Sequence, residues 1–91
     1  MSVLELSASR VAYCGLLVAS EAKVGADRAR ETALYLLVTS GGVPGALAAQ
    51  AYGCTKQYVS RILREVEDQR DDPAYEAAVS ELEQRIFQAV R

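Results

Sequence analysis

The chain has 91 residues, a net charge of −2 and 51% hydrophobic residues, which predicts one small domain. It has no histidine and only two cysteines, Cys14 and Cys54, so the usual general base, the four-ligand zinc site and a disulfide framework are all missing. Neither a glycine-rich phosphate loop nor a nucleophile elbow is present. We therefore expect a protein that is not an enzyme, needs no cofactor or metal, acts on no small-molecule substrate and keeps both thiols reduced.

The first predicted helix runs from about Ser7, a good N-cap, to Ser20. Alternatively, Ser2 and Glu5 form a capping box and the helix begins earlier. Its expected buried face consists of Val11, Cys14, Leu17 and Val18. No apolar run approaches the roughly 20 residues of a membrane span, and the chain lacks the basic start of a signal peptide. We therefore expect a cytoplasmic protein with no membrane partner.

Two more helices follow before the middle of the chain. The second is predicted from Asp27 to Thr39, and its core stripe is Ala33, Leu34, Leu37 and Val38, widened by Tyr35 and Leu36. Gly41-Gly42 should end it, with one glycine in the left-handed conformation. Pro44 favours the first turn of a third helix that reaches Ala51 or Tyr52.

Residues 45–64, GALAAQAYGCTKQYVSRILR, have the pattern of a helix-turn-helix. Ala49 is small enough for two helices to cross closely, and Gly53 occupies the turn position that needs a positive φ. Val59 and Ile62 are spaced to bury the inner face of the second helix. Thr55 is a suitable N-cap for that helix, which we expect from Lys56 to about Gln69.

The remaining side chains of this second helix should face DNA. The candidate contact residues are Thr55, Lys56, Gln57, Tyr58, Ser60, Arg61 and Arg64. Glutamine can bond adenine in two places and arginine can fork onto guanine, while serine, threonine and lysine can bond phosphates or bases. Tyr58 either touches the sugar-phosphate backbone or packs on the preceding helices. The alternative to DNA contact is an ordinary amphipathic helix whose polar side is solvated.

The distribution of charge favours DNA contact. Residues 41–64 contain three basic residues and no acidic one, whereas residues 65–91 contain three basic and eight acidic residues, a net −5 (3 − 8). A solvated face without a binding function would mix both signs. The net charge of the whole chain therefore hides a basic reading unit followed by an acidic C-terminal segment.

Asp71-Asp72-Pro73 predicts a stop followed by a new helix, from Pro73 to Val90. Its apolar positions Tyr75, Val79, Leu82, Ile86 and Ala89 form a seam of about two heptads, beside which lie Phe87 and Val90. We expect this seam to pair with a second copy, so that the predicted dimer-interface residues are Tyr75, Val79, Leu82, Ile86 and Phe87. The alternative is that the helix folds back on the core. The expected architecture is all-α, with about five helices: a helix-turn-helix domain over residues 1–72 and a C-terminal dimerisation helix over residues 73–91.

The chain resembles the TrfB/KorA family of plasmid transcriptional repressors over roughly Val24 to Asp68. The similarity rests on Val24-Gly25, Leu36 to Val38, Gly42, Pro44, Ala46, Ala49, Gly53, Thr55 and Val59-Ser60. The resemblance implies a small homodimer that binds palindromic operators in plasmid promoters and blocks transcription. Carried over by position, the reading helix would contain Thr55, Lys56, Gln57, Ser60 and Arg61. The chain departs from the family in a longer segment before Val24, in larger residues at Gln57 and Tyr58, and in a shorter C-terminal segment.

Two functions are consistent with these patterns. The first is a repressor that binds a palindromic double-stranded DNA operator as a homodimer and occludes a promoter, since a chain this small has no room for an effector domain. The second is a protein-interaction module in which the helix-turn-helix is a scaffold and the acidic C-terminal helix binds a basic partner.

Overall fold

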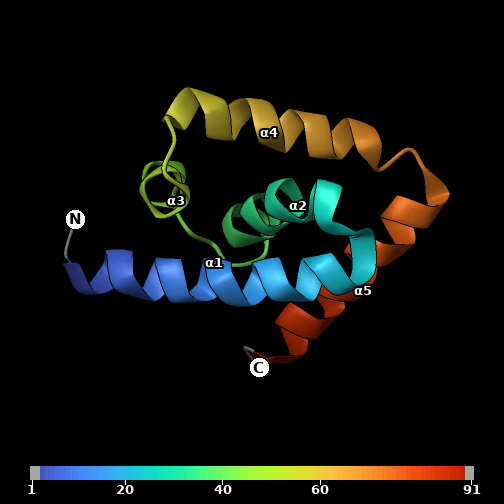
Figure 1. The fold of residues 1–91 in the computed structure, drawn as a ribbon, viewed down its shortest axis with the longest axis horizontal. Coiled ribbons are helices and arrows are strands. Elements are labelled where there is room, and N and C mark those ends of the chain that lie inside the picture. The colour runs from blue at the N-terminus through green and yellow to red at the C-terminus, as the bar shows by residue number, and fades with distance from the viewer. Residues whose placement is uncertain (1–2, 90–91) are drawn as a thin grey trace.

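The computed structural model describes residues 3–89, and this part of the chain folds into five α-helices without a strand (Figure 1). The fold class is therefore all-α, as the sequence predicts. The helices are α1 (Val3–Val24), α2 (Ala26–Thr39), α3 (Gly45–Tyr52), α4 (Lys56–Gln69) and α5 (Pro73–Ala89). Of the helix ends discussed above, Ser2 and Val90 lie outside the described residues.

Helix α2 is the centre of the fold. Its residues 32–37 are all buried, which is more than the single stripe predicted from the sequence. The reason is that α1 and α4 cover α2 from opposite sides, as Figure 1 shows, while α3 closes one end. A helix that is surrounded in this way loses its amphipathic pattern. The helix ends as expected, with Gly42 in the left-handed region at φ 68°.

Helix α1 buries a different face from the predicted one. Val11 and Val18 are 73% and 71% exposed and Cys14 is also exposed, so the predicted core face is wrong for these three residues. The side that packs on α2 and α3 instead contains Ser9, Tyr13 and Ser20 as its buried residues, with Leu17 half-buried beside them. The physical reason is that α1 has apolar residues on both of its sides, and periodicity alone does not say which side the core covers.

By length and composition alone, α1 would be long and apolar enough to cross a bilayer. The sequence does not predict such a helix, because no uninterrupted apolar run in it approaches that length. In the structure one side of this helix forms part of the protein core, since Tyr13 packs in the same cluster as the side chains of α2. The opposite side is exposed.

Helix α5 folds back on the rest of the chain. Asp72 caps it by accepting a hydrogen bond from the backbone N–H of Ala74 at 3.1 Å, and Pro73 is its first residue, as predicted. Tyr75, Val79 and Leu82 are 4%, 0% and 2% exposed within the single chain, so this part of the predicted dimer seam is corrected to an internal packing surface.

The last turns of α5 are less covered. Ile86 is half-buried against the core, and Phe87 is 60% exposed. Of the five predicted interface residues, Phe87 alone therefore keeps most of its surface accessible. The side chain of Ala89, which continues the seam in the sequence, lies outside the described residues.

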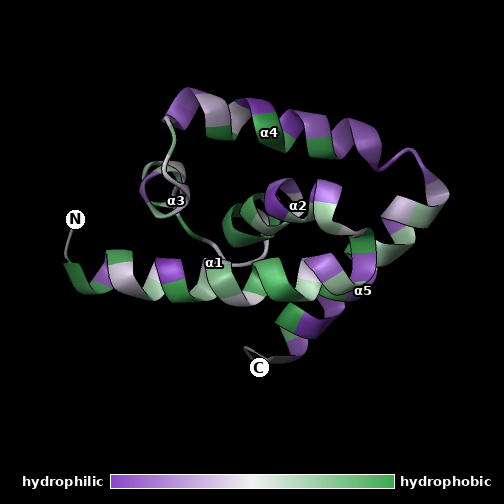
Figure 2. Cartoon of the chain, in the orientation of Figure 1, coloured by the Kyte–Doolittle hydropathy of each residue, from purple (hydrophilic) through white to green (hydrophobic). Residues whose placement is uncertain are grey.

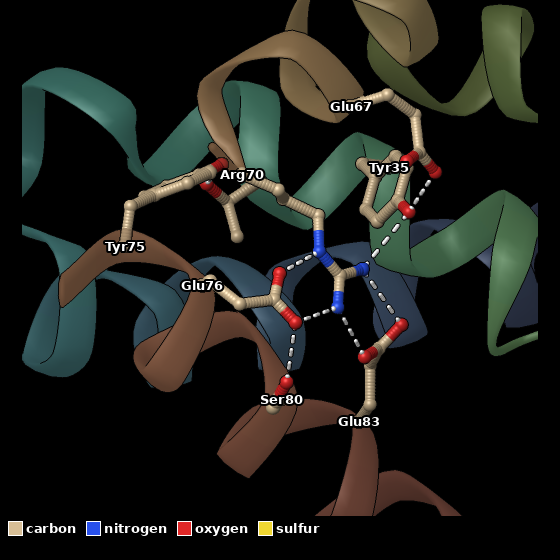
Figure 3. Close-up of polar contacts among 8 residues, drawn as sticks. Tyr35, Glu67, Arg70, Tyr75, Glu76, Ser80 and Glu83 are labelled. Atoms are coloured by element: carbon tan, nitrogen blue, oxygen red, sulfur yellow. Dashed lines mark hydrogen bonds and ion pairs between the residues drawn. The ribbon is translucent and has the colours of Figure 1, made fainter. Parts of the chain in front are cut away.

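A polar network also holds α5 in place (Figure 3). Arg70, at the C-cap of α4, pairs with Glu76 and donates to Glu83 at 3.0 and 3.1 Å and to the Tyr35 hydroxyl at 3.0 Å. Its side chain is 17% exposed. Glu76 and Glu83 raise the pKa of Arg70, so the guanidinium stays charged. Tyr35 in turn donates a hydrogen bond to Glu67. One side chain thus links α2, α4 and α5.

A second, buried contact joins α5 to α2. The hydroxyl groups of Thr32 and Tyr75 lie 2.7 Å apart, and the guanidinium of Arg28 lies 4.9 Å from the centre of the Tyr75 ring. Burial raises the pKa of Tyr75. A buried hydroxyl that has a partner fixes the register of the helix that carries it, because any shift would leave both groups unpaired.

Candidate nucleic-acid interface

The turn between α3 and α4 has the geometry that the sequence predicts. Gly53 adopts the left-handed conformation, with φ 88° and ψ 39°, and its N–H donates to the Ala49 carbonyl at 2.8 Å. Cys54 donates to the same carbonyl at 2.9 Å. Thr55 is extended, and its side-chain oxygen accepts the N–H of Tyr58 at 3.1 Å. The chain therefore leaves α3 and enters α4 through a turn of three residues that is held by these hydrogen bonds.

Helix α4 has one apolar and one polar side. Val59, Ile62 and Val66 are buried against the core, and Ala49 of α3 is buried where the two helices approach each other. Figure 2 shows the contrast along the helix, with hydrophobic residues toward α2 and hydrophilic residues on the outer edge. The predicted inner face is therefore confirmed, and the opposite side of α4 is open to solvent.

Six of the seven predicted contact residues are exposed: Thr55, Lys56, Gln57, Ser60, Arg61 and Arg64. Gln57, Arg61 and Arg64 recur at spacings of four and three and so share the outward face of the helix. A shallow depression is lined by Thr55, Gln57, Tyr58, Arg61 and Arg64. The structure thus brings the exposed predicted residues together on a single surface. We term this surface the α4 outer face and define it by the six exposed residues just named.

Tyr58 is the exception, because it is half-buried and packs on α3. Its ring stacks on that of Tyr52 at 6.0 Å between centres, and Tyr52 meets Tyr13 of α1 edge-on at 5.5 Å. Burial is the largest cause that raises the pKa of Tyr52, to about 12, so this ring stays neutral. Of the two interpretations given for Tyr58, packing on the preceding helices is the one that the structure shows.

Arg61 is held in position without being buried. Its guanidinium lies 4.8 Å from the centre of the Tyr58 ring, and its Nε lies 3.6 Å from a carboxylate oxygen of Glu65, one turn further along α4. Both charged side chains are about half exposed or more, so this ion pair is weak and easily exchanged. The aromatic ring orients Arg61 on the α4 outer face, and Glu65 is an anion that a phosphate or a base edge can replace.

Arg30 is a basic residue that was not among the predicted contact residues and that the fold brings to the same end of the molecule. It belongs to α2, but its guanidinium lies 5.3 Å from the centre of the Tyr52 ring in α3. The Tyr13 hydroxyl raises its pKa, so it stays charged. The charge count could not reveal this residue, because residues 1–40 sum to zero and Arg30 lies 22 residues before Tyr52 in the chain.

The acidic residues after Arg64 limit this surface at one end. Asp68 follows Arg64 at a spacing of four and is exposed on the same side of the helix. Its charge would repel a phosphate, so the usable part of the α4 outer face is the N-terminal half of the helix. This is the half that helix-turn-helix proteins insert into the major groove.

The acidic residues of α5 mostly have partners within the chain. Glu76 and Glu83 pair with Arg70, and Glu81 pairs with Lys23 of α1 at 2.7 Å and with Arg85 at 3.1 Å. The acidic segment is therefore in large part an internal set of ion pairs that fastens α5 to α1 and α4.

Comparison with the models of known protein families, with curated proteins and with solved structures finds no match for this chain.

Proposed function

We propose that the protein binds double-stranded DNA through the α4 outer face, reads a short sequence there, and represses transcription by occluding a promoter in the bacterial cytoplasm. The observation that supports this most strongly is a turn with the backbone geometry of a helix-turn-helix, followed by a helix whose exposed residues from Lys56 to Arg64 are all polar or basic. This combination suits insertion into the major groove, which admits one α-helix.

Each side chain has a role that follows from its chemistry and position. Gln57 and Arg61 lie on the outward face and suit base edges, since glutamine pairs with adenine and arginine with guanine. Arg64, at the C-terminal end of that face, and Lys56 and Arg30 beside it suit phosphates, which fix orientation and supply salt-dependent affinity. The rings of Tyr52 and Tyr58 contact the guanidinium groups of Arg30 and Arg61, respectively. Tyr13 packs on Tyr52, which in turn stacks on Tyr58.

Binding of a palindromic operator by a homodimer is a separate proposal, because it needs a contact between two copies of the chain. The sequence placed the dimer seam on α5, but the buried side of that helix packs on α1 and contacts α2 through Tyr75. The proposal here is that each chain supplies one reading helix to one half-site. A pair of half-sites then depends on a different contact between two copies.

The alternative function, an acidic helix that binds a basic partner, gains no support from α5. The carboxylates of Glu76, Glu81 and Glu83 are already paired with cations of the same chain. A basic partner would have to displace these bonds and expose the Arg70 network.

The test is the salt dependence of binding to duplex DNA, measured by fluorescence anisotropy. Neutralising Lys56 and Arg64 (Lys56→Gln with Arg64→Gln) removes two phosphate contacts, so the slope of log affinity against log salt should fall by about 2. The control is Arg85→Gln, which removes an exposed arginine from α5 and should leave the slope unchanged. If the control and the double variant bind alike, the proposed surface is wrong.

A further inference from the structure

The exposed side of α1 has an ordered apolar pattern. Leu4, Val11 and Val18 recur every seven residues and are 80%, 73% and 71% exposed. Ala8, Gly15 and Ala22 alternate with them, at spacings of four and three, and are exposed as well. None of these six residues is charged. We refer to them as the α1 stripe. It lies on the side of α1 opposite to the buried Ser9, Tyr13 and Ser20.

Gly15 has no role within the chain that would require a glycine. It lies in the middle of a 22-residue helix, and a Cβ atom placed there would meet nothing within 4 Å. Glycine in a helix interior is unfavourable compared with alanine. Such a residue suits a place where another backbone approaches closely. The stripe therefore has both features of a helix–helix contact: large side chains at one heptad position and small ones at the other.

We propose that the α1 stripe binds the α1 stripe of a second copy of this chain, with the two helices antiparallel. In that arrangement Leu4 lies opposite Ala22, Val11 opposite Gly15 and Val18 opposite Ala8 of the other copy, since each pair of numbers has the same sum. Every large side chain then meets a small one. A parallel pair would place large residues against large ones and leave gaps at the small positions.

The size of the stripe suits a weak dimer. From Leu4 to Ala22 it is about 27 Å long at 1.5 Å per residue, and a contact of one helix width would bury roughly 500 Å² on each copy. The total of about 1,000 Å² is near the lower limit for specific interfaces. We therefore expect dissociation constants in the micromolar range. An exposed apolar patch of this size is comparable to the largest patch on a typical monomer, and such patches often have a binding function.

Pairing through α1 is compatible with DNA contact and does not rest on it. Helices α1 and α4 lie on opposite sides of α2 (Figure 1), so the α4 outer face of each copy stays uncovered. The two reading helices then lie on the outer sides of the dimer. Association of two copies is measured without DNA, so the failure of either proposal is seen separately.

The experiment is sedimentation velocity of the full chain over a concentration series from 1 to about 300 µM. The wild type should change from monomer to dimer, and Val11→Glu should stay monomeric throughout. The control is Arg10→Glu, which alters the charge of α1 more strongly in the same direction, at an exposed position outside the stripe. A wild type that is monomeric at all concentrations, or a control that loses the dimer as Val11→Glu does, would overturn the proposal.

Gly15→Ala provides a second test, because it should weaken the dimer while it makes the monomer more stable. A variant that lost the dimer through misfolding would instead be less stable. The added methyl group should raise the thermal midpoint of the monomer, because alanine favours helix and meets no neighbour. It should also weaken the dimer at least fivefold, because it enlarges the position opposite Val11. A more stable monomer with unchanged dimerisation would refute the close approach. Wild-type protein that binds phosphatidylglycerol vesicles and does not self-associate would instead identify the stripe as a lipid-binding face.

Discussion

At the scale of single residues, Arg61 is the side chain whose position most directly links the fold to the proposed reading of bases. It stacks on Tyr58 and pairs only weakly with Glu65. We predict that Arg61→Ala costs about 1 to 3 kcal/mol of binding free energy at the preferred site and relaxes the base preference at one position. Binding assays on a panel of single-base variants of the site would measure this.

Glu65→Gln is the matched control for Arg61. It removes the partner carboxylate and leaves the guanidinium on its ring, so affinity should stay equal or increase. A loss of affinity in Glu65→Gln comparable to that of Arg61→Ala would show that the ion pair, rather than the free guanidinium, matters. Equal weakening on all DNA sequences in Arg61→Ala would make Arg61 a phosphate contact.

Arg30 should behave differently from Arg61, because its position beside Tyr52 suits a phosphate. We predict that Arg30→Ala weakens binding to every DNA sequence by the same factor and lowers the salt slope by about 1. Measuring affinity for two unrelated duplexes at several salt concentrations tests this. A change in sequence preference would contradict the assignment.

At the scale of elements, the turn between α3 and α4 depends on Gly53. A Cβ atom at φ 88° is strained even though no neighbour would touch it. We predict that Gly53→Ala lowers the free energy of unfolding by about 1 to 2 kcal/mol. The same substitution at Gly15, inside α1, should raise it by about 0.5 to 1 kcal/mol. Urea denaturation of both variants, at concentrations below dimerisation, tests the contrast. Equal effects would contradict it.

The ion pairs that attach α5 should make the stability of the fold depend on pH. Hydrogen bonds from Arg70 and then from Ser80 hold the pKa of Glu76 at about 2, below its ordinary 4.5. Because the folded pKa is the lower one, this stabilisation is complete above pH 4.5 and is lost as the pH falls toward 2. The urea midpoint should therefore fall over this range, and it should fall less steeply in Glu76→Gln. An unchanged acid slope in that variant would show that other carboxylates dominate.

The sequence predicted those elements whose determinants are local. The turn follows from Gly53 and Thr55, which act within four residues of their hydrogen-bond partners, and the start of α5 follows from Asp72 and Pro73. Arg70 is different, since its contact with Tyr35 spans 35 positions in the chain. Local patterns contain no information about such a contact. This explains why the sequence placed the α5 seam on a second copy rather than on the core.

At the scale of the whole molecule, the candidate site was predicted more completely than the packing around it. The α4 outer face follows from the phase of Val59 and Ile62, because buried positions fix which positions are exposed. Helix α1 offered two apolar sides, containing Tyr13 and Val11, and periodicity alone did not decide between them. Arg30 reaches the site only through the crossing of α2 and α3.

The arrangement of the helices also restricts how two copies can use one operator. If pairing occurs through α1, the two α4 outer faces lie on outer sides of the dimer, away from each other. We predict that duplexes with two half-sites one helical turn apart bind no more tightly per half-site than duplexes with one. Gel-shift titrations of both duplexes test this, and strong cooperativity at that spacing would contradict the α1 geometry.

The central claim is that α4 reads DNA sequence. The most direct measurement is the selection of bound duplexes from a random pool, read by sequencing, for the wild type and for Gln57→Ala and Arg61→Ala. The claim predicts an enriched short motif in the wild type that loses information at one position in each variant. A flat pool from folded protein at low salt, or a motif unchanged in both variants, would contradict it.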